Sequence, residues 1–474
     1  MTTTPIKAGP TKRFFVSMLT RDIELKDAIL DLIDNSMDGV MRVLKDSPPK
    51  DPEKPYDGFW ARISFSKDGF SIQDNCGGIP RHIAVNSAFR LGRPDDGRDD
   101  DLQTIGMYGI GMKRAIFKMG TSAKVTSTTI EGSYSVEISP EWMAQEDLWT
   151  LDLQDDAGAL ESCGTKIEVT SLHEYIAIQF ESADSNFFKD LHEDISRLYT
   201  LIIGKGFSVE LNGAPVKPKD IRLLVPPNMD TASIHPYLFR GIIRDVEVEI
   251  LVGFYRSPPA LDKLVEDEEQ ELEFPKTDNE QAGWNIVCND RLVLHADRTA
   301  VTGWGIRNIP KYHTQFSSIG GTVTMRSAHS FNLPLKTTKR GINTSSEVYL
   351  VVLDYMIEGL RKFIDFTNKW KGQSELNADV FANAQPKMPS LSALSVPDDK
   401  WVKVQKVSQY GEGFKYSPPL KLPKDPNPLK KIVFLRKEED VKAVAEFLFD
   451  DAAVKPKEVG ERCFDIQLEK ARKK

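Results

Sequence analysis

The sequence contains few of the residues and runs that disulfide frameworks, zinc sites and membrane spans require. Only four cysteines occur in 474 residues, namely Cys76, Cys163, Cys288 and Cys463. They are too far apart for a CxxC pair or a His/Cys cluster, so we expect reduced thiols and no zinc site. No run approaches the roughly 20 apolar residues of a membrane span, and the N-terminal region lacks the apolar stretch of a signal peptide. We therefore expect a cytoplasmic protein without a membrane partner.

Positive charge is also scarcer than negative charge. The 62 Lys and Arg residues are outnumbered by 70 Asp and Glu residues, which gives a formal net charge of −8. Binding to nucleic acid draws on clustered Lys and Arg, so the overall balance does not support a nucleic-acid partner. The local candidates are Arg42, Lys45 and the lysines of 424–436. With 40% hydrophobic and 28% charged residues, the composition is that of a soluble globular protein.

The length suggests two to four domains of about 100–200 residues each. The distribution of apolar segments predicts a first domain at 1–175 and a second at 176–370. Residues 371–430 are rich in Pro, Ser, Asn and Lys, which is typical of a linker. Residues 431–474 regain apolar periodicity and predict a small α/β or helical module.

Hydrophobic periodicity predicts an α+β protein in which helices and strands are mixed along the chain. In the first domain we expect helices at 22–45, 81–91 and 111–118 and strands at 61–65, 69–72, 123–139 and 164–170. Farther along we expect strands at 207–211, 246–254, 284–287 and 432–435 and helices at 346–370 and 440–449. Residues 92–105 are polar and punctuated by glycine, which predicts a mobile loop.

The first long helix carries three polar residues on one side. Asp31, Asn35 and Asp38 are spaced by four and then three residues, so they fall within about 60° of arc, opposite an apolar stripe. A solvated polar face is the simpler interpretation. A nucleotide is the alternative, because an Asn carbonyl is a hard ligand for a phosphate-bound metal. A carboxylate one turn earlier could deprotonate the water that attacks the γ-phosphate.

Two glycine-bearing segments follow this helix. The segment 74–80 (DNCGGIP) comes after a predicted strand, where a carboxylate can accept a hydrogen bond from an adenine amino group and glycine lets the backbone approach the base. The segment 106–111 (GMYGIG) precedes a helix, where backbone N–H groups can surround phosphate oxygens. Taken alone, each is equally well explained as a surface turn or an ordinary glycine loop.

Together, the order and spacing of these motifs resemble the GHKL ATPase superfamily of gyrase, the large heat-shock chaperone, histidine kinases and MutL. That family has an E-x-x-x-N-x-x-D helix, a D-x-G-x-G turn and a G-x-x-G-x-G loop, followed by a strand with a Gly-Thr pair. The corresponding residues here are Asp31, Asn35 and Asp38; Asp74 and Gly78; Gly106, Gly109 and Gly111; and Gly164 and Thr165. The resemblance implies a Bergerat-type α/β sandwich, with a mixed sheet and helices on one face, that binds ATP and Mg²⁺.

The resemblance also assigns roles to individual residues. Asn35 would hold Mg²⁺, Asp74 would read adenine, and Asp38 would support the end of the helix and the adenine pocket. Thr165 would back the adenine-reading carboxylate through water, and residues 92–105 would be the lid over ATP. The full set of implied nucleotide-binding residues is Asn35, Asp38, Asp74, Gly78, Ile79, Gly106, Gly109, Ile110, Gly111, Lys113 and Thr165.

The sequence departs from the family pattern at two positions. The usual general base is Glu, and Asp31 stands in its place. Asp is shorter by one methylene group, about 1.5 Å, and a misplacement of about 1 Å can cost about 10²-fold in rate. We therefore expect a slow Mg-dependent ATPase, or a helix shifted inward to compensate. Cys76 replaces the first glycine of D-x-G-x-G, which weakens the adenine-side match.

The second domain resembles the transducer domain of MORC-type ATPases, a ribosomal-protein-like α/β unit. The segment 283–292 (GWNIVCNDRL) is similar to a strand–turn–strand of that domain, and Lys113 after the last loop glycine also favours the prokaryotic MORC-like branch. The segment 335–340 (LKTTKR) resembles a loop that sends a lysine to the γ-phosphate. Lys339 is the preferred candidate and Lys336 the reserve, while a solvated basic loop is the alternative.

These resemblances lead to two hypotheses for function. The first is an ATP-gated switch or clamp with slow hydrolysis, which forms a nucleotide-dependent homodimer and uses the C-terminal module to hold a protein partner. Similar proteins act in prokaryotic defence or DNA-associated remodelling. The alternative is a non-hydrolysing ATP sensor or scaffold that recruits a partner. A histidine kinase is disfavoured, because the region before the helix at 22–45 contains no His that could accept a phosphoryl group.

Overall fold

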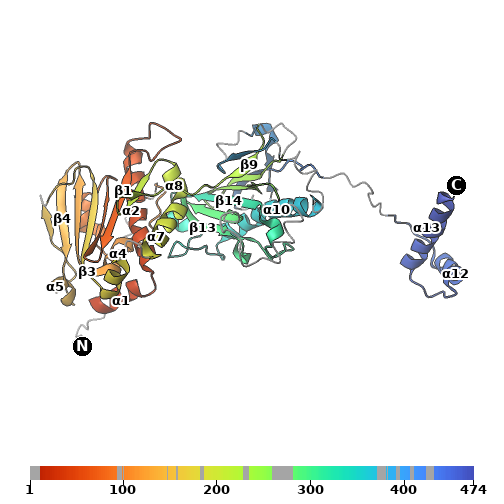
Figure 1. Ribbon diagram of the computed structural model, residues 1–474, viewed down its shortest axis with the longest axis horizontal. Helices are drawn as coiled ribbons and strands as arrows, with labels where there is room; N and C mark the ends of the chain where they lie inside the picture. The colour runs from red at the N-terminus through yellow and green to blue at the C-terminus, as the bar shows by residue number, and fades with distance from the viewer. Residues whose placement is uncertain are drawn as a thin grey trace, which may run out of the picture. The chain divides into compact units, whose positions relative to one another are not determined.

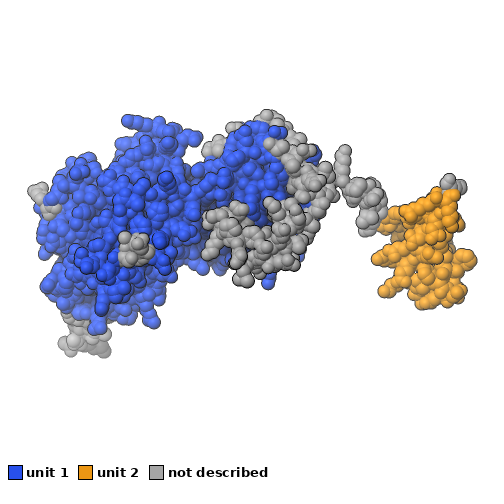
Figure 2. All heavy atoms as spheres, viewed as in Figure 1, with its two compact units in different colours: residues 1–423 blue, residues 424–474 orange. Residues whose placement is uncertain are grey.

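The chain forms two compact units, residues 1–423 and 424–474, which Figure 2 colours separately. The computed structural model describes residues 11–92, 99, 101–146, 148–155, 158–181, 186–227, 234–258, 281–370, 381, 383–390, 396–405, 410–422 and 432–473. The larger unit contains two extended β-sheets, one after the other along the chain (Figure 1). No helix in the described ranges combines the length and apolar character needed to cross a membrane.

The first sheet is mixed, as predicted. Its eight described strands run in the order β5-β4-β3-β6-β2-β1-β7-β8. They are β1 Trp60–Ser66, β2 Gly69–Asp74, β3 Gly120–Thr129, β4 Gly132–Ile138, β5 Leu153–Asp155, β6 Gly164–Leu172, β7 Ser208–Leu211 and β8 Ala214–Pro215. Neighbouring strands are antiparallel except β1 and β7, which run parallel. Residues 69–74 pair back onto β1 through the turn that Lys67 and Asp68 form.

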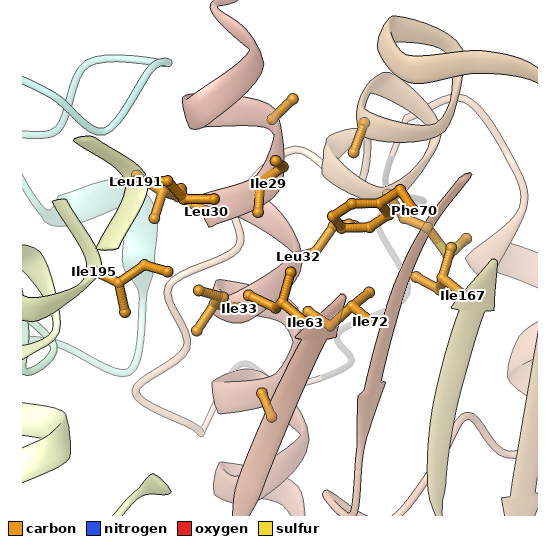
Figure 3. Packing of buried hydrophobic residues seen from close by; sticks show 14 of the residues in the cluster. Ile29, Leu30, Leu32, Ile33, Ile63, Phe70, Ile72, Ile167, Leu191 and Ile195 are labelled. Carbon is orange, nitrogen blue, oxygen red and sulfur yellow. The ribbon is translucent and has the colours of Figure 1, made fainter. Parts of the chain in front are cut away.

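The long helix α2 (Leu25–Asp46) packs its apolar stripe against this sheet. Its buried Ile29, Leu32 and Ile33 lie in one core with Ile63 of β1 and Ile72 of β2 (Figure 3). Burying each such side chain contributes about 1.5–3 kcal/mol, which sets the rotation of α2 about its axis. The opposite, polar stripe is then available to the helix that follows the glycine loop. The other helices of this region are α1 Lys12–Arg21, α3 Arg81–Ile83, α4 Gly111–Met119, α5 Pro140–Ala144, α6 Glu174–Phe180, α7 Asn186–Leu198 and α8 Thr200–Gly204.

The first sheet extends beyond the boundary predicted at residue 175. Strand β7 pairs with β1, and buried Ile195, Tyr199 and Phe207 belong to the core of the first sheet. A short apolar strand is stabilised by the open edge beside β1, because that edge presents unpaired backbone groups. The sequence periodicity identified this strand, but it could not tell which sheet the strand would join.

The second sheet has α10 (Glu347–Trp370) packed against β10 and β11. Its described strands run in the order β13-β12-β14-β11-β10-β17-β16, and β9 and β15 form a separate pair. Phe254 of β11 meets Phe363 of α10 edge to face, with ring centroids 5.2 Å apart. The strands are β9 Leu223–Val225, β10 Tyr237–Ile243, β11 Val246–Phe254, β12 Gly283–Cys288, β13 Arg291–Asp297, β14 Ile319–Arg326, β15 Gln385–Lys387, β16 Val402–Lys403 and β17 Gly411–Tyr416. The short helical turns are Ala300–Thr302, Thr314–Phe316, Ser330–Asn332 and Asp398–Lys400.

Several sequence predictions differ from the structure. The predicted linker 371–430 contributes β15, β16 and β17, and β17 pairs with β10 along its length. The observed helix is shorter than the predicted helix 81–91. The α-helical turn α3 spans Arg81–Ile83 and continues as a π-helical turn over Ala84–Ala88. Of the predicted lid 92–105, residues 93–98 and 100 lie outside the described residues.

The C-terminal unit consists of two described helices, α12 (Glu438–Phe449) and α13 (Pro456–Arg472). The prediction of a strand at 432–435 is wrong, because these residues have no strand pairing. Their β-branched and aromatic side chains favour a strand, but an extended segment becomes one only when a neighbouring strand completes its hydrogen bonds. The helical version of the predicted module therefore describes this unit better.

Candidate functional site

One cavity of about 790 Å³ brings together the polar stripe of α2, the turn after β2 and the glycine loop. Its volume is in the range typical of small-molecule sites. Thr337 and Lys339 reach it from the region of the second sheet, whereas the reserve candidate Lys336 is not among its lining residues. The sequence-predicted residues that line it are Asp31, Asn35, Asp38, Asp74, Gly78, Ile79, Gly106, Gly109, Ile110, Gly111, Lys113, Thr165 and Lys339.

The polar stripe of α2 is not a solvated face. Asp31 and Asp38 are only 4% and 5% exposed, while Asn35 between them is exposed and lines the cavity. Burying a carboxylate is costly unless it is paired or hydrogen-bonded. Both aspartates must therefore have partners that the helix alone does not provide.

Asp74 lies at the end of β2 and is held by three donors. Its Oδ1 accepts from the N–H of Cys76 at 3.0 Å and of Thr165 at 3.1 Å, and its Oδ2 accepts from the Ser36 hydroxyl at 2.9 Å. Burial raises the pKa of the Asp74 carboxyl, and these hydrogen bonds partly offset the rise. Each carboxylate oxygen has two acceptor sites, so Oδ2 keeps one for a further donor. We expected Thr165 to contact Asp74 through water. The structure shows a direct hydrogen bond from the Thr165 backbone N–H to Asp74 Oδ1.

The turn after Asp74 packs tightly against β3 and β6. Gly78 has a φ of +73°, and a Cβ placed there would lie 2.3 Å from the carbonyl oxygen of Thr128. A side chain is therefore excluded at this position. The N–H of Ile79 donates to the Ser127 hydroxyl at 2.7 Å, and the Tyr134 hydroxyl donates to the Ile79 carbonyl at 2.7 Å. These contacts give the cavity a rigid wall.

Asp38 positions the start of the glycine loop. Its two carboxylate oxygens accept from the N–H of Ile105 at 2.6 Å and of Gly106 at 2.9 Å. Burial raises the pKa of the Asp38 carboxyl, and the charge of Arg42 and the Ile105 hydrogen bond partly offset the rise. We expected Asp38 to support the end of the helix and the adenine pocket. Its observed partners are backbone N–H groups at the start of the loop that would hold phosphates.

Lys113 is buried rather than solvated. Its side chain is directed at backbone, and Nζ donates to the carbonyl of Ala88 at 2.8 Å and to that of Gly109. Ala88 ends the π-helical turn, a type of turn that is frequent at functional sites. In this conformation Lys113 braces the glycine loop.

Asp31 lies between two cations, Arg114 and Lys339. Arg114 of α4 donates to its Oδ2, and Lys339 Nζ lies 3.1 Å from its Oδ1. Burial by itself would raise the pKa of the Asp31 carboxyl, but the charges of Lys339 and then Arg114 outweigh that effect. The pKa consequently falls below its ordinary value. A carboxylate with a lowered pKa is a weaker proton acceptor.

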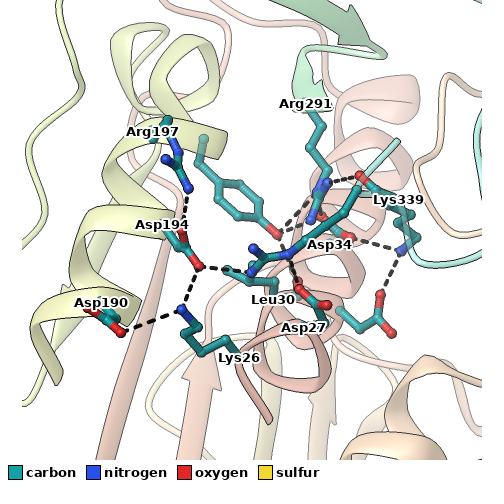
Figure 4. Close-up of polar contacts among 12 residues, drawn as sticks. Lys26, Asp27, Leu30, Asp34, Asp190, Asp194, Arg197, Arg291 and Lys339 are labelled. Atoms are coloured by element: carbon teal, nitrogen blue, oxygen red, sulfur yellow. Dashed lines mark hydrogen bonds and ion pairs between the residues drawn. The ribbon is translucent and has the colours of Figure 1, made fainter. Parts of the chain in front are cut away.

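The fully buried Asp34 is the main feature that sequence reasoning missed. It accepts from the Tyr199 hydroxyl at 2.7 Å, from Arg291 Nε at 2.7 Å and from Lys339 Nζ at 2.8 Å. Tyr199 lies between α7 and α8, whereas Arg291 of β13 and Lys339 of the segment before α10 belong to the second-sheet region. A single carboxylate of α2 therefore contacts both regions, and Figure 4 shows Asp34 beside Arg291 and Lys339. Asp34 is three residues after Asp31 and four before Asp38, so helical spacing places it on the polar side with them, and nothing in the sequence signals separately that it would be buried.

Lys339 is held in a costly backbone conformation. Its φ is +55° and its side chain is buried, which for a non-glycine residue costs on the order of 1 kcal/mol or more. Its carbonyl accepts from Arg291 Nη1 at 3.0 Å. Arg291 therefore holds both Asp34 and the backbone that places Lys339 at the cavity.

The donor set fits a phosphate-bound Mg²⁺ better than a protein-only metal site. In the described ranges, no group of three or more His, Cys, Asp or Glu side chains is placed to hold a metal. The exposed amide of Asn35 is a hard oxygen donor inside the cavity. Mg²⁺ commonly takes one or two protein ligands together with phosphate oxygens and water, so these residues fit that ion.

Comparison with known families supports this interpretation for residues 23–165. Residues 23–165 match the family described as "Histidine kinase-, DNA gyrase B-, and HSP90-like ATPase". The match supports the GHKL ATPase superfamily for this segment. The GHKL segment includes the polar stripe of α2, the turn after β2, the glycine loop and Thr165, and it supports ATP binding. Lys339 lies outside it. No curated protein matches the chain.

Proposed function

We propose that this chain is an ATP-gated conformational switch that hydrolyses Mg-ATP slowly. The observation that carries the proposal is that Lys339, from outside the GHKL segment, lines the same cavity as Asp31, Asn35 and Asp74. A ligand in that cavity would contact both the GHKL segment and the region of the second sheet. Such a ligand can shift the equilibrium between conformations of the larger unit, because a conformational equilibrium shifts only when the ligand makes different contacts in the two states.

The chain's own residues divide into those that would bind the base and those that would meet the phosphates. Asp74 would accept a hydrogen bond from the adenine amino group at its second Oδ2 site. The backbone N–H groups of 109–111 would meet phosphate oxygens at the N-terminus of α4. Bound Mg²⁺ would neutralise phosphate charge, and the Asn35 amide would supply one of its ligands.

Gating would follow from competition for Lys339. In the present conformation its ammonium group pairs with Asp31 at 3.1 Å and Asp34 at 2.8 Å. A γ-phosphate brings negative charge into the cavity and would attract the same ammonium group. If Lys339 turns toward phosphate, Asp31 loses one of the two cations that lower its pKa. The carboxylate would then become a better base when ATP is present.

Slow hydrolysis and the sensor alternative both follow from the state of Asp31. A short carboxylate held by Arg114 and Lys339 is poorly placed to take a proton from water. If this pairing persists with ATP bound, the chain would be a non-hydrolysing sensor that recruits a partner. The proposal has further parts. They are the MORC-like subtype, a nucleotide-dependent homodimer, a partner site on the C-terminal unit, cytoplasmic localisation and a role in defence or DNA-associated remodelling.

Comparing turnover in the unaltered chain and in Asp31→Asn separates the two alternatives. Asn cannot act as a general base, and we expect ATP turnover to fall about 10²-fold or more. Phosphate release under excess Mg-ATP measures this rate, and Asp190→Asn on the exposed side of α7 is the control. Equal, background-level rates in the unaltered and Asp31→Asn chains would remove the enzyme hypothesis and favour the sensor.

A further inference from the structure

The start of the glycine loop packs against the second sheet and α10. Met107 is buried, and it belongs to the core cluster formed by the second sheet and α10 rather than to the core of the first sheet. The adjacent Tyr108 meets Phe331 edge to face, with ring centroids 5.9 Å apart. The glycines on either side of these residues line the cavity. Consecutive loop residues therefore contact the nucleotide site and the second core.

Asn289 fixes the backbone at the entry to this loop. Its Nδ2 donates to the carbonyl of Thr104 at 2.8 Å and to that of Ser327 at 3.0 Å, and its Oδ1 accepts from the Ser327 N–H at 3.0 Å. Asn289 is buried in the turn between β12 and β13, with a φ of +46°. One amide thus joins the loop entry to the β12–β13 turn and to the end of β14.

The same stretch of loop is held from the other side by α2. Asp38 accepts from the N–H groups of Ile105 and Gly106, immediately after the carbonyl that Asn289 holds. Thr104 is 1% exposed, so water does not readily replace the bond from Asn289. A movement of residues 104–107 must therefore break these contacts or carry the β12–β13 turn with it.

We propose that Asn289 and Met107 form a second coupling between the nucleotide cavity and the second sheet, separate from Lys339. The coupling deepens the proposed function and rests on it, because the nucleotide must change the loop for the coupling to act. Lys339 would respond to charge at the γ-phosphate. Asn289 and Met107 respond to the conformation of the loop itself. Both Asn289 and Met107 are positioning residues, since neither contributes a group to the reaction.

Hydrogen exchange in the full chain, with and without Mg²⁺ and a non-hydrolysable ATP analogue, tests this coupling. In the unaltered chain we expect the analogue to slow exchange in β12, β13 and the end of β14. Lys339→Met should keep part of that protection. Asn289→Gly preserves the left-handed turn while deleting the amide, and we expect it to lose the remaining protection and to weaken analogue binding about five- to tenfold.

Two further variants make the result decisive. Asn212→Gly is the matched control, because Asn212 also lies in a turn with positive φ and hydrogen-bonds backbone through its side chain, at Phe65. It should leave binding and protection unchanged. Phe331→Ala removes a side chain that is 66% exposed, so it should fold normally and reduce the protection. Phe331→Ala decides the question if Asn289→Gly proves unstable.

The outcomes that overturn the inference can be told apart from failure of the proposed function. If the analogue does not bind the unaltered chain, the proposed function fails and the coupling fails with it. If the analogue binds but Lys339→Met abolishes all protection in the second sheet, only the second coupling is wrong. Unchanged affinity and protection in folded Asn289→Gly or Phe331→Ala would also overturn it alone.

Discussion

Asp74→Asn should weaken ATP binding by about 10²-fold while leaving the fold intact. The amide oxygen can still accept from the N–H groups of Cys76 and Thr165, so those donors keep a partner. The amide nitrogen then replaces Oδ2 and turns a donor toward both Ser36 and the adenine amino group. Losing an acceptor in a buried site and leaving a polar group unpaired costs about 1–3 kcal/mol, which corresponds to a change of about five- to 150-fold.

Calorimetric titration with a non-hydrolysable ATP analogue measures this effect. Asp155→Asn is the matched control, because Asp155 belongs to the same sheet and forms an exposed pair with Arg81. The control should bind the analogue like the unaltered chain. Titration of GTP, whose base presents an acceptor where adenine has its amino group, should show the smaller loss in Asp74→Asn. Unaltered ATP affinity in folded Asp74→Asn would mean that Asp74 does not read the base.

Arg291→Met should destabilise the larger unit by about 3–5 kcal/mol. Arg291 is 2% exposed and pairs with fully buried Asp34 at 2.7 Å. It also supports the carbonyl of Lys339. Removing one partner of a buried ion pair leaves the other charge without its compensation, and such changes typically cost about 3–5 kcal/mol. Because the same arginine places Lys339 at the cavity, ATP affinity should fall as well.

Urea denaturation monitored by tryptophan fluorescence gives the change in unfolding free energy. The control Arg307→Met removes an ion pair with Asp354 that is nearly half exposed on both sides, and surface pairs contribute only about 0–1 kcal/mol. Arg291→Lys tests geometry apart from charge, because lysine cannot hold Asp34 and a carbonyl with a planar fork of donors. If Arg291→Met and Arg307→Met have the same small effect, Asp34 does not depend on Arg291.

Local patterns were predicted well from the sequence because the forces that create them act between near neighbours. The apolar stripe of α2 predicted a helix over 22–45, and the observed helix is Leu25–Asp46. The glycine loop was expected to lead into a helix, and α4 begins at Gly111. In such segments, periodicity and turn residues alone constrain the backbone.

Features that depend on distant partners were missed for a physical reason. Asn289 lies in the segment 283–292 that family resemblance picked out, but nothing in the sequence shows that it contacts Thr104 or that Met107 joins the core of the second sheet. The segment 432–435 has strand-forming residues, but it pairs with no strand among the residues that the structure describes. Strand β7 joins the first sheet because an edge is open there. Local propensity cannot identify a tertiary partner.

The most direct test of the account is the size and shape of the full chain with and without Mg²⁺ and a non-hydrolysable ATP analogue. Sedimentation velocity combined with small-angle scattering measures both quantities. We expect the analogue to change the mass, the radius of gyration or both, and we expect chelation of Mg²⁺ or Lys339→Met to reduce that change. If the analogue binds and neither mass nor shape changes, the ATP-gated switch is wrong even though the cavity binds ATP.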